Sequence, residues 1–302
     1  MTDVRVGRRT IELSNTEKVL FPSDGITKGD LVDYYHRVAD RMVPHLEGFP
    51  LALHRFPDGI DAGGFFQKQV PASFPEWIDR VELERERGGT VTHIVCNDAA
   101  TLVYLADQAV ITPHRLLGPA AHPRRPREVI VDLDPPGDDP ALVRHATRLL
   151  RDLLDEAVLP GFVKATGSKG VHVHIPLDGR ASFDQVRPFA RDLADALVAR
   201  DPERLTVEHR KENRDGRLFV DWLRNGYGQH AVAPYAVRSL PEAPVAVPLT
   251  WDEATARDFH PRRYTVTNVF RRLDRVADPW AGWRRRARSL ATVRRDLEDV
   301  AA

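Results

Sequence analysis

The chain has 302 residues, with 44 basic and 44 acidic side chains, so its formal net charge is zero. Its hydrophobic fraction of 42% and charged fraction of 29% are typical of a globular protein with a substantial core. No apolar segment is long enough to span a bilayer and no secretory signal is evident, while a single cysteine excludes an internal disulfide and a cysteine-rich zinc site. We therefore expect a cytoplasmic protein. A zero net charge neither favours nor excludes nucleic acid, since binding needs only a local basic patch.

In the first half of the chain, the hydrophobic pattern predicts three strands and two helices. The strands are expected at 10–13, 51–56 and 64–69. Thr27 is a good N-cap for a helix from 28 to about 44, and an apolar stripe predicts a second helix over 98–110. A connector rich in proline and arginine follows, near 119–127.

The second half alternates strands with helices. The expected elements are a strand at 128–133, a helix at 142–157, a hairpin of 161–165 with 171–176, a helix at 183–200, strands at 218–222 and 231–237, and a basic, mainly helical tail from 252. This order predicts an α+β layer sandwich with a mixed sheet. We expect one domain over 1–302, with two interleaved halves that share a cleft and meet at the connector as the alternative.

The most informative segment is the strand that ends in Asp132 and Asp134. Side chains two positions apart in a strand lie on the same face, so the two carboxylates should be neighbours. A second strand ends in Asp221 and supplies a third carboxylate if the two strands pair. Carboxylate oxygens suit Mg²⁺ or Mn²⁺, and three of them suit a two-metal phosphoryl-transfer site. Taken alone, an Asp-x-Asp pair is more often a pair of turn residues.

A glycine-rich turn from Thr166 to Gly170 lies inside the predicted hairpin. Small residues let backbone N–H groups approach a polyphosphate, and Lys169 adds a positive charge. The spacing is not that of a Walker A loop, and an ordinary turn with an exposed lysine is an equal alternative. His172 and His174 follow on one face of the next strand, where either would contact a nucleotide or be a core histidine; we favour His172.

Two arginines near strand ends are candidates for triphosphate binding, because a guanidinium group suits phosphate oxygens. Arg214 lies in the polar loop that leads into the Asp221 strand, and Arg238 follows the strand expected at 231–237. Only six of the 44 basic residues are lysines, so most arginines in this chain are surface residues without a specific role.

Together these segments resemble the polymerase domain of bacterial DNA ligase D, a member of the archaeo-eukaryotic primase superfamily. The similarity extends over nearly the whole chain. Its motifs are Leu13–Pro22, Gly64–Gln69, Val131–Pro135, Gly167–His172, Phe219–Trp222, Ala233–Arg238 and Asp278–Trp280. The resemblance implies a primase-like two-subunit sandwich with mixed, mainly antiparallel sheets, flanking helices and one central cleft.

The resemblance also implies an activity and its partners. The expected enzyme is a nucleotidyltransferase that adds nucleotides, preferably ribonucleotides, to primer 3′ ends under the direction of a template. Its DNA would be a gapped or broken duplex with a 5′-phosphate, met in non-homologous end joining or excision repair. The cofactor would be Mn²⁺, or Mg²⁺, at two ions per site. The expected partners are NTPs or dNTPs, Ku and a separate DNA ligase. The protein would be a bacterial monomer associated with the nucleoid and would not bind a membrane.

The resemblance assigns roles to individual residues. Asp132, Asp134 and Asp221 become metal ligands. Residues implied in nucleotide binding are Phe65, Phe66, His114, Thr166, Gly167, Ser168, Lys169, His172, Arg214 and Arg238. Arg55 and Lys68 are expected at the template, and Phe65 and Phe66 match aromatic residues that stack against the nucleotide base or the template. Two adjacent strand phenylalanines are less attractive as core residues, because successive side chains point to opposite faces.

Lys18 and Lys28 match lysines that hold the 5′-phosphate on the far side of a gap. Lys28 opens the predicted helix, where free N–H groups would also meet an anion. Solvated lysines are the alternative for both. The sequence departs from the family at His54, which replaces a basic residue, at the shifted segment around His114, and at Thr166, which replaces a serine but keeps the hydroxyl.

Two rival functions use the same residues. A metal-dependent nuclease or phosphoesterase would also need a carboxylate cluster, and a DNA-end-binding module would need only the basic and aromatic groups. Candidate triphosphate ligands favour the transferase over the nuclease, and an intact acidic triad argues against the binding module. No ligase or phosphoesterase motif is found, so we expect a stand-alone polymerase or an excised domain.

Overall fold

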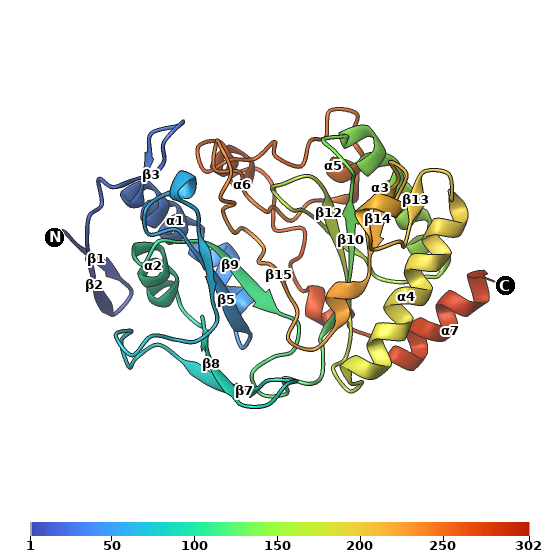
Figure 1. The fold of residues 1–302 in the computed structure, drawn as a ribbon, viewed down its shortest axis with the longest axis horizontal. Coiled ribbons are helices and arrows are strands. Elements are labelled where there is room, and N and C mark those ends of the chain that lie inside the picture. The colour runs from blue at the N-terminus through green and yellow to red at the C-terminus, as the bar shows by residue number, and fades with distance from the viewer. Residues whose placement is uncertain (1, 302) are drawn as a thin grey trace. The chain divides into compact units, whose positions relative to one another are not determined.

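The computed structural model describes residues 2–301, whose chain forms two compact units. Unit 1 comprises residues 1–123, 230–246 and 264–272, and unit 2 comprises 124–229, 247–263 and 273–302. The chain passes from the first unit to the second between Pro123 and Arg124, inside the proline- and arginine-rich segment. Figure 1 shows the course of the chain and the element labels.

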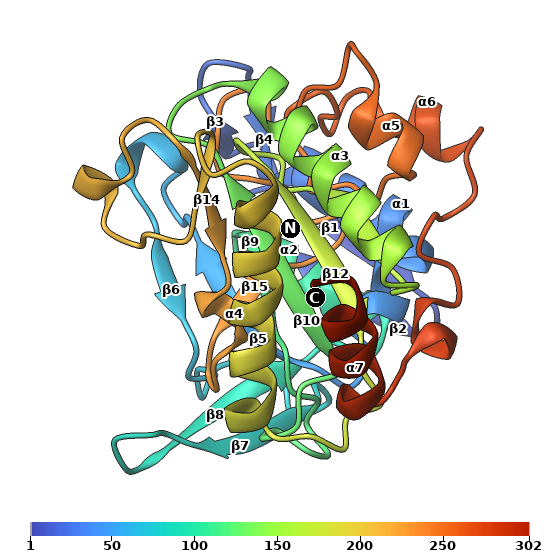
Figure 2. The same cartoon turned by 90° about the vertical axis from the view of Figure 1, so that its right-hand side faces the viewer.

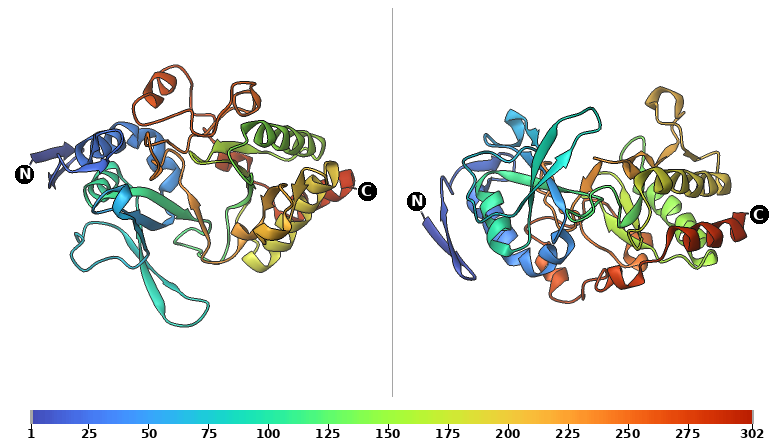
Figure 3. Two further views of the ribbon diagram at one scale, coloured as in Figure 1. Left: turned by 45° about the horizontal axis from the view of Figure 1, so that its top comes forward. Right: turned by 90° about the horizontal axis from the view of Figure 1, so that it is seen from below.

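Unit 1 is built on a six-stranded sheet. Its strands are β5 (Pro50–Arg55), β6 (Phe65–Gln67), β7 (Arg80–Glu84), β8 (Thr90–Val95), β9 (Val110–Leu116) and β15 (His230–Val232). The order is β15-β9-β5-β8-β7, and β6 pairs with β5 beyond the end of β8. All these pairs are antiparallel. Figure 3 shows the β7–β8 hairpin projecting from the rest of this sheet.

Two helices and two small hairpins complete unit 1. The helices α1 (Lys28–Leu46) and α2 (Ala99–Asp107) pack against each other, and α2 lies against β9. The hairpins are β1 (Thr2–Val6) with β2 (Arg9–Leu13) and β3 (Val19–Phe21) with β4 (Ile26–Thr27). Two short helical segments, η1 (Ile60–Ala62) and α6 (Val269–Leu273), come later in the chain. Thr27 caps α1 as predicted, in a reciprocal box with Asp30.

Unit 2 is built on a five-stranded sheet of order β11-β12-β10-β14-β13. Its strands are β10 (Glu128–Asp134), β11 (Phe162–Ala165), β12 (Val171–Pro176), β13 (Leu205–Thr206) and β14 (Leu218–Asp221). Only the β13–β14 pair is parallel. Its helices are α3 (Pro140–Glu156), α4 (Phe183–Arg200), α5 (Trp251–Thr255) and α7 (Leu290–Ala301), with short turns η2 (Lys211–Asn213), η3 (Leu223–Asn225) and η4 (Trp283–Arg286).

Alternation gives the unit 2 sheet one apolar and one polar face. On β10, Val129, Val131 and Leu133 point to the apolar face and are fully buried. Helices α3 and α4 pack on β10, and Figure 2 shows them lying across the sheet with α7 beside α4. Because buried apolar side chains need apolar neighbours, the helices cover this face. The intervening residues of β10, Asp132 and Asp134 among them, point to the other face.

The predicted fold class is confirmed: helices flank mixed, mainly antiparallel sheets. The helix expected over 98–110 ends at Asp107, since β-branched Val110 and Ile111 begin strand β9, which the sequence pattern did not reveal. The strand expected over 231–237 ends at Val232, before Pro234. Strands β1, β3, β4, β7, β8 and β13 were not predicted, and the tail from 252 contains only short helices before α7.

Candidate active site

Two acidic strands of unit 2 lie side by side. Strands β10 and β14 pair antiparallel, and Asp132 and Asp221 are direct partners across the pair. Asp134 lies two residues further along β10, on the same face as Asp132. The pairing that the sequence left conditional is therefore present. It collects three carboxylates on one face of the sheet.

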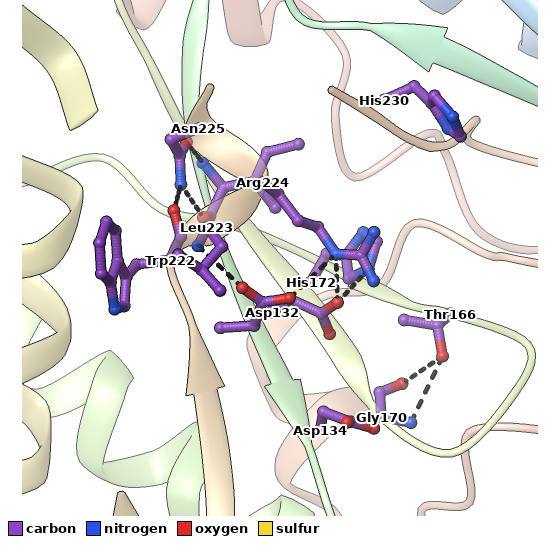
Figure 4. Close-up of polar contacts among 12 residues, drawn as sticks. Asp132, Asp134, Thr166, Gly170, His172, Trp222, Leu223, Arg224, Asn225 and His230 are labelled. Atoms are coloured by element: carbon purple, nitrogen blue, oxygen red, sulfur yellow. Dashed lines mark hydrogen bonds and ion pairs between the residues drawn. The ribbon is translucent and has the colours of Figure 1, made fainter. Parts of the chain in front are cut away.

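A single arginine contacts two of these carboxylates. The Arg224 Nε–H donates to Asp132 Oδ2 at 2.5 Å, and the same nitrogen lies 3.7 Å from Asp221 Oδ2 (Figure 4). His172 approaches from the other side, with Nε2 3.3 Å from Asp132 Oδ2. Burial alone would raise the pKa of Asp132, but the charges and hydrogen bonds of His172 and Arg224 hold it below the usual range.

The negative charges of Asp221 and Asp134 are balanced less completely by neighbouring cations than that of Asp132. Burial, followed by repulsion from Asp132, raises the pKa of Asp221 to about 6. The same two causes raise the pKa of Asp134, although the Arg214 Nη1 lies 3.4 Å from its Oδ2. The three carboxylates therefore carry more negative charge than their neighbours balance, which is the condition under which a bound cation stabilises a site.

The donor chemistry of this site fits a hard divalent cation, because all three side chains offer carboxylate oxygens. Within residues 2–301, however, no three His, Cys, Asp or Glu side chains are already arranged around a common metal position. Figure 4 shows the Arg224 guanidinium lying against Asp132, where it balances part of the charge. A metal ion would thus have to meet carboxylates that already have a cationic neighbour.

The turn that carries Arg224 is fixed by hydrogen bonds to the backbone. Asp221 Oδ1 accepts from the Leu223 N–H at 2.8 Å and so starts η3. The fully buried Asn225 accepts from the Ile130 N–H at 2.8 Å and donates to the Ile130 carbonyl at 2.7 Å. Its side chain continues the ladder along β10 where β14 has ended. Arg224 is therefore held beside Asp132 by a rigid turn.

Buried polar groups continue across the sheet from the carboxylates. Lys164 on β11 partners His172 on β12, which partners Asp132. His174, on the same face as His172, places Nδ1 2.9 Å from Glu128 Oε2 and packs against Trp280. Burial lowers the pKa of His172 to about 4 and that of His174 to about 3, so both are neutral at pH 7. His172, the histidine favoured from the sequence, therefore contacts Asp132, whereas His174 contacts Glu128.

The turn between β11 and β12 is compact and internally bonded. The Thr166 hydroxyl donates to the Gly170 carbonyl at 2.9 Å and accepts from the Ser168 and Gly170 N–H groups. A side chain at Gly170 would place its Cβ 1.9 Å from the Leu133 carbonyl oxygen, so only glycine fits there. Lys169 is exposed at the tip, and the Arg262 Nε donates to the Ser168 carbonyl at 3.1 Å.

Arg214 is a buried arginine with several partners in unit 2. Its Nε and Nη2 donate to the carbonyls of Glu208 and His209 at 3.1 and 2.9 Å, and its guanidinium packs over Phe219 at 4.1 Å. Together with the contact to Asp134, these bonds hold the charge beside the acidic strand ends. The structure thus places Arg214, a candidate triphosphate ligand from its loop before β14, beside Asp134.

In unit 1, two exposed phenylalanines lie on the edge strand β6. Phe65 and Phe66 are 50% and 47% exposed, so neither is a core residue. His54 stacks on Phe66 with ring centroids 4.3 Å apart and an interplanar angle of 4°. Arg55 lies on the paired strand β5 and donates to Gln67. The exposed ring faces provide a surface on which a base could stack.

His114 comes from β9, the strand that the sequence pattern did not reveal. Its Nδ1 lies 3.1 Å from Nδ1 of His230, and its ring meets Phe66 edge to face at 5.1 Å. Arg238 also belongs to unit 1, close enough to His54 that its charge, after burial, lowers the pKa of that imidazole. Lys68 is exposed just beyond β6. The predicted nucleotide-binding residues are thus divided between the two units.

Residues 27–280 match the model of the LigD primase-polymerase domain. A LigD end-joining protein of Mycobacterium tuberculosis is 34% identical over 277 residues, and that of Pseudomonas aeruginosa is 33% identical over 300 residues. These alignments cover 89% and 97% of the chain but 36% and 35% of the relatives, so the chain spans about a third of their length. The chain belongs to the LigD primase-polymerase family.

A solved structure agrees with this assignment. The polymerase domain of Mycobacterium tuberculosis ligase D, in complex with DNA, has a TM-score of 0.84 and 32% sequence identity, covering 92% of this chain and 99% of that one. The family resemblance in the sequence is confirmed. LigD primase-polymerase domains are metal-dependent nucleotidyltransferases, and the chain is an enzyme of this class. None of its described helices is both long and apolar enough to cross a membrane.

The two lysines that resemble 5′-phosphate ligands of the family differ in accessibility. Lys18 is 40% exposed and pairs with the exposed Asp58 at 2.7 Å. Lys28 is buried, and its ammonium lies 2.9 Å from Asp107 Oδ1 and donates to the Ser14 hydroxyl and the Asp107 carbonyl at 3.0 and 3.1 Å. Lys18 is therefore the more accessible of the two.

The expectation of free N–H groups at the start of α1 is wrong. The Lys28 N–H donates to the Lys18 carbonyl, the Gly29 N–H to the Thr16 carbonyl, and the Asp30 N–H to the Thr27 hydroxyl. The preceding hairpin folds back on the helix and uses these donors. The acidic Asp30 in the first turn would in addition repel an anion.

Sequence reasoning missed Arg224 and Asn225. Their positions three and four residues after Asp221 give a weak signal, because a residue three positions on can fold back over a strand end in a tight turn. In a chain so rich in arginine, that signal does not distinguish Arg224 from surface arginines. The contacts that matter connect it to β10, which is distant in the sequence.

Proposed function

We propose that the chain extends a primer 3′ end along a DNA template at gaps and broken ends, with ribonucleotides preferred over deoxyribonucleotides. The observation that carries the proposal is the pairing of β10 with β14, which brings Asp132 and Asp221 together with Asp134 beside them. Membership of the LigD primase-polymerase family supports nucleotide transfer as the reaction of these carboxylates. The solved relative in complex with DNA supports a DNA substrate.

Asp132, Asp134 and Asp221 would hold the metal ions, which we propose to be two Mn²⁺ or Mg²⁺ ions per site. When bound, the ions neutralise charge on the transferred phosphate and on the attacking and leaving oxygens. The primer 3′-hydroxyl loses its proton to solvent and its oxygen forms a bond to the α-phosphorus. The bond from that phosphorus to the oxygen shared with the β-phosphate breaks, and pyrophosphate leaves. The chain's own residues orient the groups that take part.

In unit 2, the turn formed by Thr166, Gly167, Ser168 and Lys169 is proposed to hold the triphosphate. Lys169 is exposed and contributes a point charge, while Arg214 contributes a planar guanidinium beside Asp134. The hydroxyl of Thr166 shapes the turn through its bonds to Gly170. We assign His172 to positioning Asp132, because it is buried and its Nε2 faces that carboxylate.

In unit 1, the exposed rings of Phe65 and Phe66 are proposed to stack on the nucleotide or template base. His114 would lie near the sugar, Arg238 at the triphosphate, and Arg55 and Lys68 at the template. Lys18 and Lys28 are proposed to hold the 5′-phosphate across a gap. Because Lys28 is already paired with Asp107, Lys18 makes the direct contact and Lys28 supports the segment that carries it.

The proposed setting is bacterial end joining or excision repair at the nucleoid, with Ku and a separate ligase as partners. The relatives that are named as end-joining proteins support this setting. We propose that residues 1–302 act as one primase-polymerase domain and as a monomer.

Four DNA substrates test the proposal: a gapped duplex with a 5′-phosphate, the same duplex without it, an open primer–template and an unprimed strand. Each is incubated with Mn²⁺ and either NTPs or dNTPs. We expect nucleotide-dependent lengthening of the primer that is faster with NTPs and with the 5′-phosphate. Primer shortening independent of nucleotide would indicate a nuclease instead, and binding without either change would indicate a DNA-end-binding module.

A further inference from the structure

Arg224 lies against Asp132 and Asp221, two of the carboxylates that we propose as metal ligands. Its Nε is 2.5 Å from Asp132 Oδ2 and 3.7 Å from Asp221 Oδ2, so one guanidinium lies against two of the three proposed ligands. Its side chain is 36% exposed, whereas those of Asp132 and Asp221 are 7% and 16% exposed. The arginine thus covers carboxylates that are otherwise buried, and it approaches them from the side that solvent reaches.

Hydrogen bonds fix the backbone of the turn that carries Arg224, so its side chain starts beside the carboxylates. Asp221 itself starts the η3 turn by accepting from the Leu223 N–H, and Asn225 fastens the end of the turn to both polar groups of Ile130. Arg224 lies between these two fixed points. Its attraction to Asp132 is the strongest influence on its own pKa, which is raised.

A guanidinium and a divalent cation cannot both occupy the space next to Asp132 Oδ2. The Arg224 hydrogen bond occupies one of the two lone pairs of this oxygen, and His172 Nε2 lies 3.3 Å from the same oxygen, so little room is left for a further cation. Two cations within a few ångströms also repel each other. Arg224 can leave without unfolding its turn, because the turn is held by the backbone and by Asn225. Its long side chain can then rotate toward solvent.

We propose that Arg224 sets the metal affinity of this site: its positive charge lies against Asp132 and Asp221 in the metal-free enzyme, and it is displaced when the metal binds. The proposal rests on the proposed function, since it requires these carboxylates to be the metal ligands. Arg224 is a positioning residue that holds the two carboxylates close together. Because its charge competes with that of the metal for Asp132, Arg224 weakens metal binding.

The first test measures Mn²⁺ binding to the full chain by calorimetry, without DNA or nucleotide. Replacing Arg224 by glutamine removes the competing charge, so we expect Arg224→Gln to bind Mn²⁺ on the order of tenfold more tightly than the wild type. Arg224→Lys keeps the charge and should remain within a few-fold of the wild type. Arg180→Gln, which removes a 90% exposed arginine of unit 2, is the matched control for net charge. Unchanged or weaker Mn²⁺ binding by Arg224→Gln overturns the proposal.

A second test uses the wild-type chain and therefore does not depend on how a variant folds. In protein labelled with ¹⁵N-arginine, the Nε–H signal of Arg224 is identified by its loss in Arg224→Gln. Saturation with diamagnetic Mg²⁺ should move this signal to the position of a solvated arginine. A signal that stays in place while Mg²⁺ binds overturns the displacement.

Asp221→Asn separates this proposal from the function on which it rests. If Asp221→Asn binds Mn²⁺ as the wild type does, the carboxylates are not the metal site and both proposals fail. If Asp221→Asn loses binding but Arg224→Gln does not gain it, only the role of Arg224 fails.

Discussion

The proposed base-stacking residues of unit 1 and the proposed metal ligands of unit 2 are held in opposite ways. In unit 1 the stacking residues are exposed aromatic rings on β6, an edge strand of three residues, with imidazoles packed around them. In unit 2 the metal ligands are carboxylates on a central strand pair, and Asp132 among them is buried and contacted by His172 and Arg224. Stacking tolerates small shifts of a ring, whereas carboxylates that share a cation need fixed separations. Substitutions should therefore affect folding and activity together in unit 2 but separately in unit 1.

The largest effect on stability is expected at the turn beneath the carboxylates. Gly170→Ala would place a Cβ 1.9 Å from the Leu133 carbonyl oxygen, so β10 and the turn must separate. We expect a loss of about 3 kcal/mol or more in unfolding free energy, together with loss of extension activity. Gly137→Ala is the control, because nothing lies within 4 Å of its Cβ. Equal stability of the two variants in urea unfolding would contradict the close approach.

Asn225→Ala tests whether the turn after β14 is held as firmly as the sheet. The substitution leaves the Ile130 N–H and carbonyl without their amide partner in a fully buried position. We expect a loss of about 2–4 kcal/mol in unfolding free energy, since a buried unpaired group costs about 1–3 kcal/mol. The exposed Asn213→Ala should change stability by less than about 0.5 kcal/mol. A similar result for both variants would show that the Asn225 bonds do not hold the turn.

In unit 1, Phe66→Ala should reduce nucleotide binding without loss of stability. The ring is 47% exposed, so its removal leaves no cavity in the core. We expect KM for the nucleotide to rise on the order of tenfold, from the loss of a stacking contact of about 1–3 kcal/mol. Val158→Ala, which removes another exposed apolar side chain, should leave KM unchanged. An unchanged KM for Phe66→Ala in steady-state extension would remove β6 from the binding surface.

The smallest effect is expected in the pH dependence of stability. Burial lowers the pKa of His174 to about 3, below its unfolded value near 6.5, so the folded protein binds fewer protons than the unfolded chain. The contribution of His174 to stability is therefore complete above pH 6.5 and is lost as the pH falls toward 3, by about 1.4 kcal/mol per pH unit. His174→Gln cannot titrate, so unfolding curves between pH 6.5 and 4.5 should show a correspondingly smaller slope. An unchanged slope would contradict a buried, neutral His174.

Features that depend on local patterns were predicted from the sequence. The period of two places Asp132 and Asp134 on one face, and the capping signal places the start of α1 at Lys28. The β10–β14 pairing, by contrast, was left conditional, because the two strands are distant in the chain. Alternation within a strand and capping at a helix end are determined by neighbours in the chain, so no tertiary information was needed.

Features that depend on distant partners could not be predicted. Lys28 lies at an N-terminal helix position that is commonly solvated, but it is buried in an ion pair with Asp107, which is 79 residues away in the sequence. Strand β9 was hidden because its apolar start continues the stripe of α2, and the switch occurs at Ala109, whose φ of 55° breaks the helix. The contact of Arg224 with Asp132 likewise joins residues 92 positions apart.

The central claim is that the acidic ends of β10 and β14 perform nucleotide transfer. It is tested most directly by single-nucleotide extension of a labelled primer–template in Mn²⁺, with the wild type and with Asp132→Asn and Asp221→Asn. We expect the wild type to lengthen the primer by one NTP-dependent step and each variant to be slower by a factor on the order of 10³ or more, while DNA binding is retained. Near-normal extension by both variants would contradict the claim.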